Sequence, residues 1–296
     1  MTERDLVGYG QRPPDPMWPG GARLALSFVL NYEEGGERTP LEGDPESESY
    51  LHEVVGAPPT AGQRNLNTES MFEYGSRAGF WRIHRIFCEH GLPLTVYAVA
   101  QALERNPEAA RAMVEAGWEV ASHGWRWIDY LDMPEEDERA DMRRAIEAIE
   151  RVCGQRPVGW YTGRTSEATR RLVVEEGGFL YDSDSYADEL PYWVEVAGQQ
   201  HLVIPYTLDA NDFKFLIPNG FVTASDFLEY LVDSFERLYK EGARMMSVGL
   251  HCRITGRPGR AVALDRFLAH VKARDGVWVT TRAEIARHWR EHHPPG

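Results

Sequence analysis

Cysteine, positive charge and long apolar runs are all scarce in this sequence. Its three cysteines, Cys88, Cys153 and Cys252, form no C-x-x-C pair, which argues against a disulfide framework and favours a reducing compartment. The net charge is −14, with 32 basic against 46 acidic residues, so nucleic acid and anionic membranes are not expected partners. No stretch approaches the roughly 20 apolar residues of a membrane span, and no apolar run follows the charged start. We expect a cytoplasmic protein that acts on a small molecule.

Short apolar runs alternate with helical patterns along most of the chain. Strands are expected at Leu24–Leu30, Leu94–Ala98, Trp118–Ser122, Val158–Tyr161, Phe179–Asp182, Trp193–Val196, Leu202–Pro205, Met245–Leu250 and Val277–Thr280. Helices are expected at Arg77–His90, Pro107–Ala116, Pro134–Cys153, Ser166–Glu176, Ala224–Lys240 and after the capping box at Thr281. This alternation predicts parallel βα units, hence an α/β fold with a deformed (β/α) barrel of about seven parallel strands.

Two segments depart from this alternation within the single catalytic domain expected over residues 1–296. Residues 1–20 contain four prolines and predict an extended N-terminal arm. Residues 35–76 are rich in Gly, Pro, Glu and Ser and show no sustained periodicity. A segment of this length is usually functional, so we expect an irregular loop at the barrel mouth or at a subunit interface.

Polar residues follow the strands at the end where a barrel carries its chemistry. Glu33 and Glu34 follow the first strand, His123 follows the third, Arg164 follows the fourth and His251 ends the eighth. Adjacent glutamates point in different directions if the strand is still extended there. If both enter one pocket, their repulsion raises the pKa of one and suits it to act as a base.

His123 could be a metal ligand, a base or a substrate contact. A catalytic zinc usually has three protein ligands and an open position. Glu34 and His123 would supply two, but four residues after His123 stands Trp127, whose indole does not coordinate zinc. A third ligand could come from Asp182, Asp184 or the long loop. The sequence therefore predicts no metal and no other cofactor, with Glu34 and His123 as the ligands if a metal binds.

Other side chains have more than one possible role. His251 could donate a proton near neutral pH, and Arg164 could orient a carboxylate or bind a carbonyl oxygen. Asp182 and Asp184 share one face of a strand end and could orient Arg164 or accept hydrogen bonds from a substrate. Backbone N–H groups near Tyr161–Gly163 are candidate donors to an oxyanion. The aromatic residues Trp125 and Trp127 could wall a pocket or simply pack in the core.

These motifs resemble those of the polysaccharide deacetylase (NodB-homology) family over roughly Leu24 to Val279. Glu33-Glu34-Gly35 is similar to the family's Asp-Asp-Gly, in which the first acid is the base and the second a metal ligand. His123 to Trp127 is similar to its His-x-x-x-His, and Leu250-His251 to the strand end that carries its general acid. The resemblance implies that Glu33 is the base, that Glu34 stands at a former ligand position, and that His251 is the acid. The segments Gly159–Arg164 and Tyr181–Asp184 are similar to its other active-site strand ends.

Three segments further resemble the cofactor-independent allantoinase branch of this family: Asn31–Gly35, Glu73–Arg82 and Ser122–Trp127. The resemblance implies a homotetramer that opens the hydantoin ring of allantoin to give allantoate, in purine catabolism. Tyr32, Glu73, Arg77 and Tyr161 are then further expected substrate contacts. The alternatives are a carbohydrate de-N-acetylase, a hydrolase of another cyclic imide, and a binding module without activity.

Overall fold

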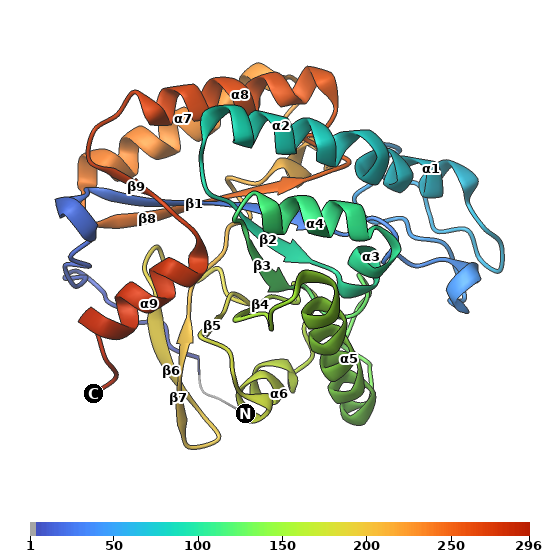
Figure 1. Cartoon of the computed structure of the whole chain (residues 1–296), viewed down its shortest axis with the longest axis horizontal. Coiled ribbons are helices and arrows are strands. Elements are labelled where there is room, and N and C mark those ends of the chain that lie inside the picture. The colour runs from blue at the N-terminus through green and yellow to red at the C-terminus, as the bar shows by residue number, and fades with distance from the viewer. Residues whose placement is uncertain (1–3) are drawn as a thin grey trace.

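The computed structural model describes residues 4–296, and its centre is a nine-stranded sheet (Figure 1). The strand order is β6-β7-β5-β4-β3-β2-β1-β8, and β9 pairs with the first half of β1. The strands are β1 (Leu24–Tyr32), β2 (Thr95–Ala98), β3 (Glu119–Ser122), β4 (Gly159–Trp160), β5 (Tyr181–Asp182), β6 (Tyr192–Val196), β7 (Gln199–Val203), β8 (Arg244–His251) and β9 (Val277–Val279). Apart from the antiparallel hairpin β6–β7, all pairings are parallel, which confirms the predicted α/β class and deformed barrel.

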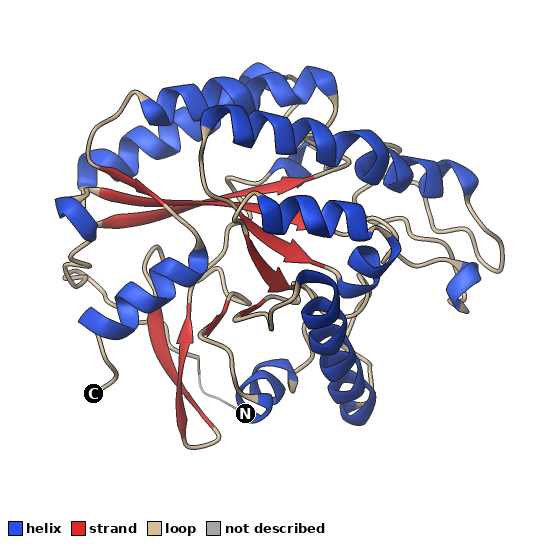
Figure 2. Cartoon of the chain, viewed as in Figure 1, coloured by secondary structure: helices blue, strands red, loops and turns tan. Residues whose placement is uncertain are grey.

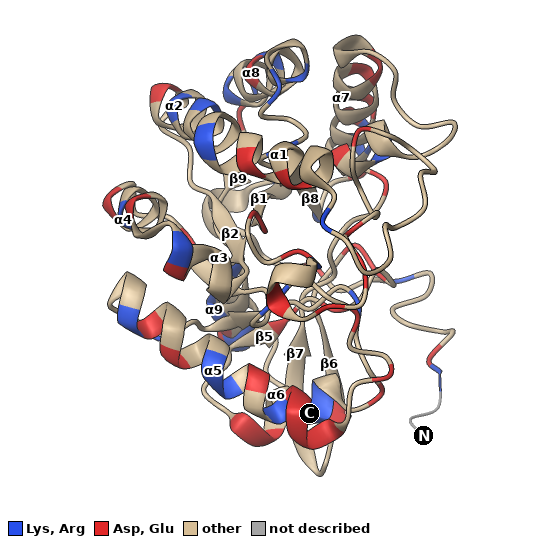
Figure 3. Ribbon diagram, turned by 90° about the vertical axis from the view of Figure 1, so that its right-hand side faces the viewer, with Lys and Arg blue, Asp and Glu red and all other residues tan. Residues whose placement is uncertain are grey.

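Helices flank the curled sheet (Figure 2), and Figure 3 shows them arranged around it in a view turned by 90°. They are α1 (Leu66–Tyr74), α2 (Phe80–His90), α3 (Ala100–Arg105), α4 (Pro107–Glu115), α5 (Glu135–Cys153), α6 (Thr169–Glu176), α7 (Ala224–Glu241), α8 (Pro258–Lys272) and α9 (Arg282–His292). Short turns of helix occur at η1 (Pro19–Gly21), η2 (Pro40–Glu42), η3 (Gly75–Gly79) and η4 (Asp212–Leu216). Acidic residues are spread over these helices and the loops, in keeping with the net negative charge (Figure 3).

The register of the parallel strands brings their carboxyl ends to one edge of the sheet. Asn31 of β1 pairs with His251 of β8, and Tyr32 pairs with Ala98 of β2, which in turn pairs with Ser122 of β3. The residues that follow β1, β3 and β8 therefore lie next to one another, as the sequence predicted from the strand ends.

The curled sheet is not closed into a complete barrel, and a buried arginine lies in its interior near the gap. Arg282, at the start of α9, is fully buried and donates hydrogen bonds to the hydroxyls of Ser27 and Ser247 and to the carbonyls of Ile204 and Pro205. It thus joins β1 and β8 to the segment after β7, which pairs with β8 through the isolated bridge between Asn211 and Gly249. In a closed barrel, backbone hydrogen bonds of a further strand would connect these two edges of the sheet. Here that bridge and the side-chain hydrogen bonds of Arg282 connect them.

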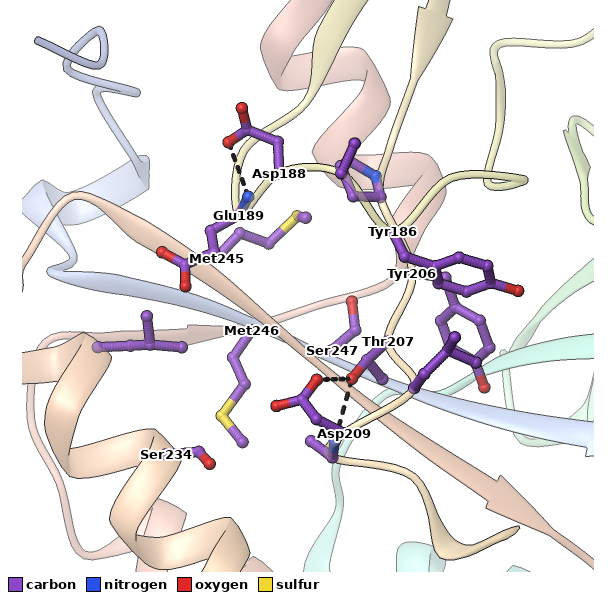
Figure 4. Close-up of a pocket in the computed structure, with 15 residues that line it drawn as sticks. Tyr186, Asp188, Glu189, Tyr206, Thr207, Asp209, Ser234, Met245, Met246 and Ser247 are labelled. Atoms are coloured by element: carbon purple, nitrogen blue, oxygen red, sulfur yellow. Dashed lines mark hydrogen bonds between the residues drawn. The ribbon is translucent and has the colours of Figure 1, made fainter. Parts of the chain in front are cut away.

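The open side of the sheet also holds a cavity of about 600 Å³ (Figure 4). Its lining includes Tyr206, Thr207, Asp209, Met245 and Ser247. Thr207 donates a hydrogen bond to Asp209, so this wall is held by its own side chains. The residues predicted to carry chemistry do not line this cavity.

The prediction of an irregular segment over residues 35–76 is wrong for its last part. Residues 66–74 form α1, and η3 is a turn of π-helix that continues into α2. The Asn65 side chain caps α1 by accepting a hydrogen bond from Thr68 N, and Phe72 is its one fully buried aromatic ring. With so few apolar positions, α1 has no amphipathic periodicity that the sequence could reveal.

The N-terminal arm packs on the C-terminal helix, as far as it is described; its residues 1–3 lie outside the described part. Trp18 is buried against Trp289 and His288, and His288 Nε2 lies 2.8 Å from the Pro16 carbonyl oxygen. Over residues 4–296, no helix is both long and apolar enough to cross a membrane.

Candidate active site

Glu33 lies between two histidines at the carboxyl edge of the sheet. Its Oε1 is 3.4 Å from His123 Nε2 and 3.5 Å from His251 Nε2, and all three side chains are buried. Burial alone would raise the pKa of Glu33, but the charges of Arg253 and His251 hold it well below the usual range. Glu33 is therefore ionised at neutral pH, with one oxygen directed at two imidazoles.

Asp212 holds the far side of the His251 ring. Its Oδ1 lies 2.6 Å from His251 Nδ1, while its Oδ2 accepts hydrogen bonds from His251 N and from the backbone and hydroxyl of Thr255. Although burial disfavours the imidazolium, the charges of Glu33 and Asp212 raise the pKa of His251 to about 9. His251 is thus protonated at neutral pH and can donate a proton from Nε2.

Arg253 is the residue that pairs with Glu33, whereas the sequence had offered Arg164 as a residue that could orient a carboxylate. Its Nη1 lies 2.6 Å from Glu33 Oε2, and its Nε donates to the carbonyl of Leu51. The guanidinium is buried over the rings of Phe72 and Trp127. Two buried carboxylates at the end of β1 require a buried cation nearby. The adjacent glutamates were therefore the feature of the sequence that indicated a buried arginine or lysine in the site.

Glu34 turns away from the histidines and supports the loop around Arg253. Its Oε1 accepts a hydrogen bond from Arg253 N, and its Oε2 accepts one from Glu33 N. Burial raises the pKa of Glu34, and repulsion from Glu33 adds to that effect. The glutamate with the raised pKa is therefore not the one that faces the histidines. Gly75 of η3 makes room for Glu34, because a Cβ there would lie 2.3 Å from Oε1.

Trp127 forms a wall of the site together with Tyr50 from the long loop. The two rings stack with centroids 5.9 Å apart, and the Arg164 guanidinium lies 4.3 Å from the centroid of Trp127. Arg164 donates a hydrogen bond to the Trp127 carbonyl, and its Nη2 lies 3.9 Å from Glu48. Arg164 thus binds Trp127 and lies near Glu48, and its hydrogen bonds and ion pairs among the described residues do not include Glu33.

The backbone N–H groups proposed as oxyanion donors are already engaged. Thr162 N and Gly163 N donate to the carboxylate of Asp184 at 2.7–3.0 Å, and Tyr161 N donates to Ser122 O. Asp184 therefore closes the turn after β4, and that turn cannot offer these donors to a substrate without breaking the contact.

Other predicted substrate contacts lie in the core or on the surface. Tyr32 points into the core against Phe80, and the Trp125 ring is covered by Arg144 of α5. Tyr161 is buried and stacks on Tyr97, with its ring 5.0 Å from that of His123.

Three more of the predicted substrate contacts form ion pairs away from the cluster. Asp182 is bound by Arg170 at 2.8 Å and lies 3.0 Å from His201. Glu73 and Arg77 pair with each other at 3.5 Å, with 61% and 79% of their side chains exposed. Neither pair belongs to the buried cluster around Glu33.

The donor set does not fit a catalytic metal ion. Across residues 4–296 there is no group of three His, Cys, Asp or Glu side chains that could hold one. Trp127 offers no lone pair, and Glu34 is engaged by two backbone N–H groups. The buried guanidinium of Arg253 lies 3.8 Å from Glu34 and would repel a divalent ion there.

Comparison with known proteins agrees with this fold. The family model for polysaccharide deacetylase matches residues 68–178. A Schizosaccharomyces pombe protein assigned by name to the polysaccharide deacetylases is 44% identical, with 98% of each chain covered. The chain belongs to the polysaccharide deacetylase family.

Two solved structures resemble the whole chain. One is named as the allantoinase PuuE, with 56% identity and a TM-score of 0.98 over all of both chains. The other is a Pseudomonas aeruginosa protein named for the polysaccharide deacetylases, with 57% identity and a TM-score of 0.97, again over all of both chains. A peptidoglycan deacetylase of Helicobacter pylori is more distant, at 26% identity over 75% of this chain.

Proposed function

We propose that this protein hydrolyses the hydantoin ring amide of allantoin to give allantoate, without a metal ion. The observation that carries the proposal is the buried set of Glu33, His251 and Arg253, in which the charges that a hydrolysis needs are all supplied by side chains. The likeness to the allantoinase structure over the full length of both chains supports the choice of substrate.

In the proposed reaction each group has a separate task. Glu33 Oε1 accepts a proton from the water that attacks the ring carbonyl, and His123 lies within reach of the same water. Protonated His251 delivers its Nε2 proton to the departing ring nitrogen as the C–N bond breaks. Transfer of a proton from Glu33 to His251, whose Oε1 and Nε2 are 3.5 Å apart, then restores the starting state.

The aromatic pair next to the cluster favours a small substrate. Trp127 and Tyr50 stack on each other beside the charged cluster, and Leu51 of the same loop supplies a carbonyl that fixes Arg253. A hydantoin is flat and its carbonyl is activated by the neighbouring ring groups, so it needs less electrophilic help than a simple acetamide. A polymer would need an open groove next to Trp127, but Tyr50 of the long loop packs against that ring.

The names of several relatives favour a second candidate, de-N-acetylation of a carbohydrate. That reaction also breaks an amide with the help of a base and an acid. It would act on an unactivated acetamide, for which the family resemblance implies a metal ion, and the donor set here does not fit one.

The test is to assay purified protein on racemic allantoin before and after exhaustive chelation, while measuring bound metal. Turnover that survives removal of metal is the expected result. N-acetylated chitin oligomers and other cyclic imides, assayed in parallel, separate the candidates. Deacetylation with no allantoin turnover would replace the proposal by the second candidate, and dependence on added zinc would overturn its metal-free chemistry.

A further inference from the structure

Arg253 has a hydrogen-bonding group that nothing in the fold uses. Nη1 binds Glu33 and Nε binds the Leu51 carbonyl, but Nη2 has no partner within residues 4–296 although it is buried. A buried donor left unpaired costs free energy comparable to a lost hydrogen bond. An acceptor atom on a bound ligand would complete the hydrogen bonding of this group.

The position of this guanidinium is as informative as its free donor. It lies 2.6 Å from Glu33 and 3.8 Å from Glu34, with its carbon 4.8 Å from the centroid of Trp127. Glu34 and Trp127 are two of the residues at the positions that resemble a metal-binding set. A fixed organic cation therefore stands beside the same carboxylates that would otherwise attract a metal ion.

We propose that Arg253 takes the place of a catalytic metal ion, with Nη2 donating to the carbonyl oxygen of the substrate as it becomes an oxyanion. This proposal rests on the function proposed above. It makes Arg253 a catalytic residue in addition to its role as partner of Glu33.

The electron and proton movements balance without any further reactant. The water oxygen forms a bond to the ring carbonyl carbon, its proton goes to Glu33, and the C=O π electrons move onto oxygen. Arg253 donates a hydrogen bond to that oxyanion and keeps its proton, because a guanidinium does not deprotonate in proteins. As the oxyanion collapses, the C–N bond breaks and the nitrogen takes the proton of His251.

The two roles of Arg253 reinforce each other. In the resting site its charge holds the pKa of Glu33 down, which weakens Glu33 as a base. When negative charge develops on the substrate oxygen, Arg253 interacts with both that oxygen and Glu33. Its charge then stabilises the Glu33 carboxylate less, so the pKa of Glu33 rises while Glu33 is accepting the proton. Arg253 therefore lowers the barrier to water attack in two ways, by stabilising the oxyanion and by allowing Glu33 to become a stronger base.

The first test replaces Arg253 and restores its chemistry from solution. Arg253→Ala is expected to lower kcat by about 10²- to 10³-fold, the usual effect of losing one oxyanion donor. Millimolar guanidinium chloride is expected to restore turnover saturably, whereas methylammonium, which has the charge but no planar fork, is not. Arg253→Lys keeps a cation for folding and is expected to stay impaired. Arg260→Ala, on the following helix, is the control and should show no rescue.

The second test does not depend on activity toward allantoin. Zinc content after dialysis is compared between Trp127→His and Trp127→His/Arg253→Ala. If Arg253 holds the place of the metal, only the double variant retains zinc. Equal zinc in both variants, including none in both, would overturn the proposal, as would a folded Arg253→Ala that guanidinium fails to rescue. Absence of allantoin turnover by the unmodified protein would instead refute the proposed function, while the zinc comparison would still stand.

Discussion

Replacing Asp212 by asparagine tests how the fold prepares His251 to donate a proton. Glu33 and Asp212 overcome the effect of burial and raise the pKa of His251 to about 9. At pH 7.5 an acid with a pKa of 9 is about 97% protonated, whereas an imidazole with a pKa near 6.5 is about 9% protonated. Loss of the Asp212 charge can thus lower kcat by up to about tenfold, solely because a smaller fraction of His251 is protonated. Because Asp212 also fixes the ring through Nδ1, we expect kcat at pH 7.5 to fall by roughly 10- to 10²-fold.

The assay is the pH dependence of kcat for the unmodified protein and for Asp212→Asn between pH 5 and 10. In the unmodified protein, activity is expected to decline above about pH 9 as His251 loses its proton. In the variant this decline moves toward neutral pH, and lowering the pH recovers part of the loss. Asp209→Asn is the matched control, since Asp209 binds Thr207 and Tyr230 outside the cluster and should leave the profile unchanged.

The stability of the same proteins gives an independent check. Because its folded pKa exceeds the unfolded value of 6.5, His251 contributes stability that is complete below pH 6.5 and is lost as the pH rises through about 9. Asp212→Asn should remove part of that contribution. A variant whose kcat is reduced by one constant factor at every pH would refute the reasoning, because the carboxylate would then act only through geometry.

Three further results are expected. His251→Asn should lower kcat by about 10²- to 10⁴-fold, and an active variant would remove His251 from the mechanism. Gly75→Ala should destabilise the fold by about 1–3 kcal/mol in denaturant titrations, because its Cβ would meet Glu34, whereas Gly259→Ala has open space and should not. The long loop exposes apolar side chains such as Val54, and we expect light scattering to give the mass of a tetramer; a monomer at assay concentration would contradict this.

The sequence predicted the parts of the site that follow strands. Glu33, His123 and His251 each come after an apolar run that forms β1, β3 or β8, and parallel pairing brings such residues to one edge. Those runs are long enough to be recognised without knowledge of their neighbours. The order of the strands was predictable for the same reason, whereas helices α1, α3 and α8 were not expected.

The residues that tune the site were not predictable in this way. Asp212 begins a short 3-10 turn with no periodic pattern, and Arg253 lies in a turn two residues beyond His251. Their importance comes from contacts with His251, Glu33 and Leu51, which are distant in sequence. Spacing along the chain carries no information about such contacts, so Arg164 was given the task that Arg253 performs.

The guanidinium of Arg282 has a consequence for the synthesis of the protein. It links Ser27 of β1 to Ser247 of β8 and to the segment after β7, and it is translated after all of them. During translation the serine hydroxyls of β1 and β8 therefore lack their guanidinium partner until residue 282 has left the ribosome. Premature termination shortly before residue 282 should therefore yield a chain that cannot seal its sheet and is cleared by cellular proteases, although every residue of the catalytic cluster has already been made.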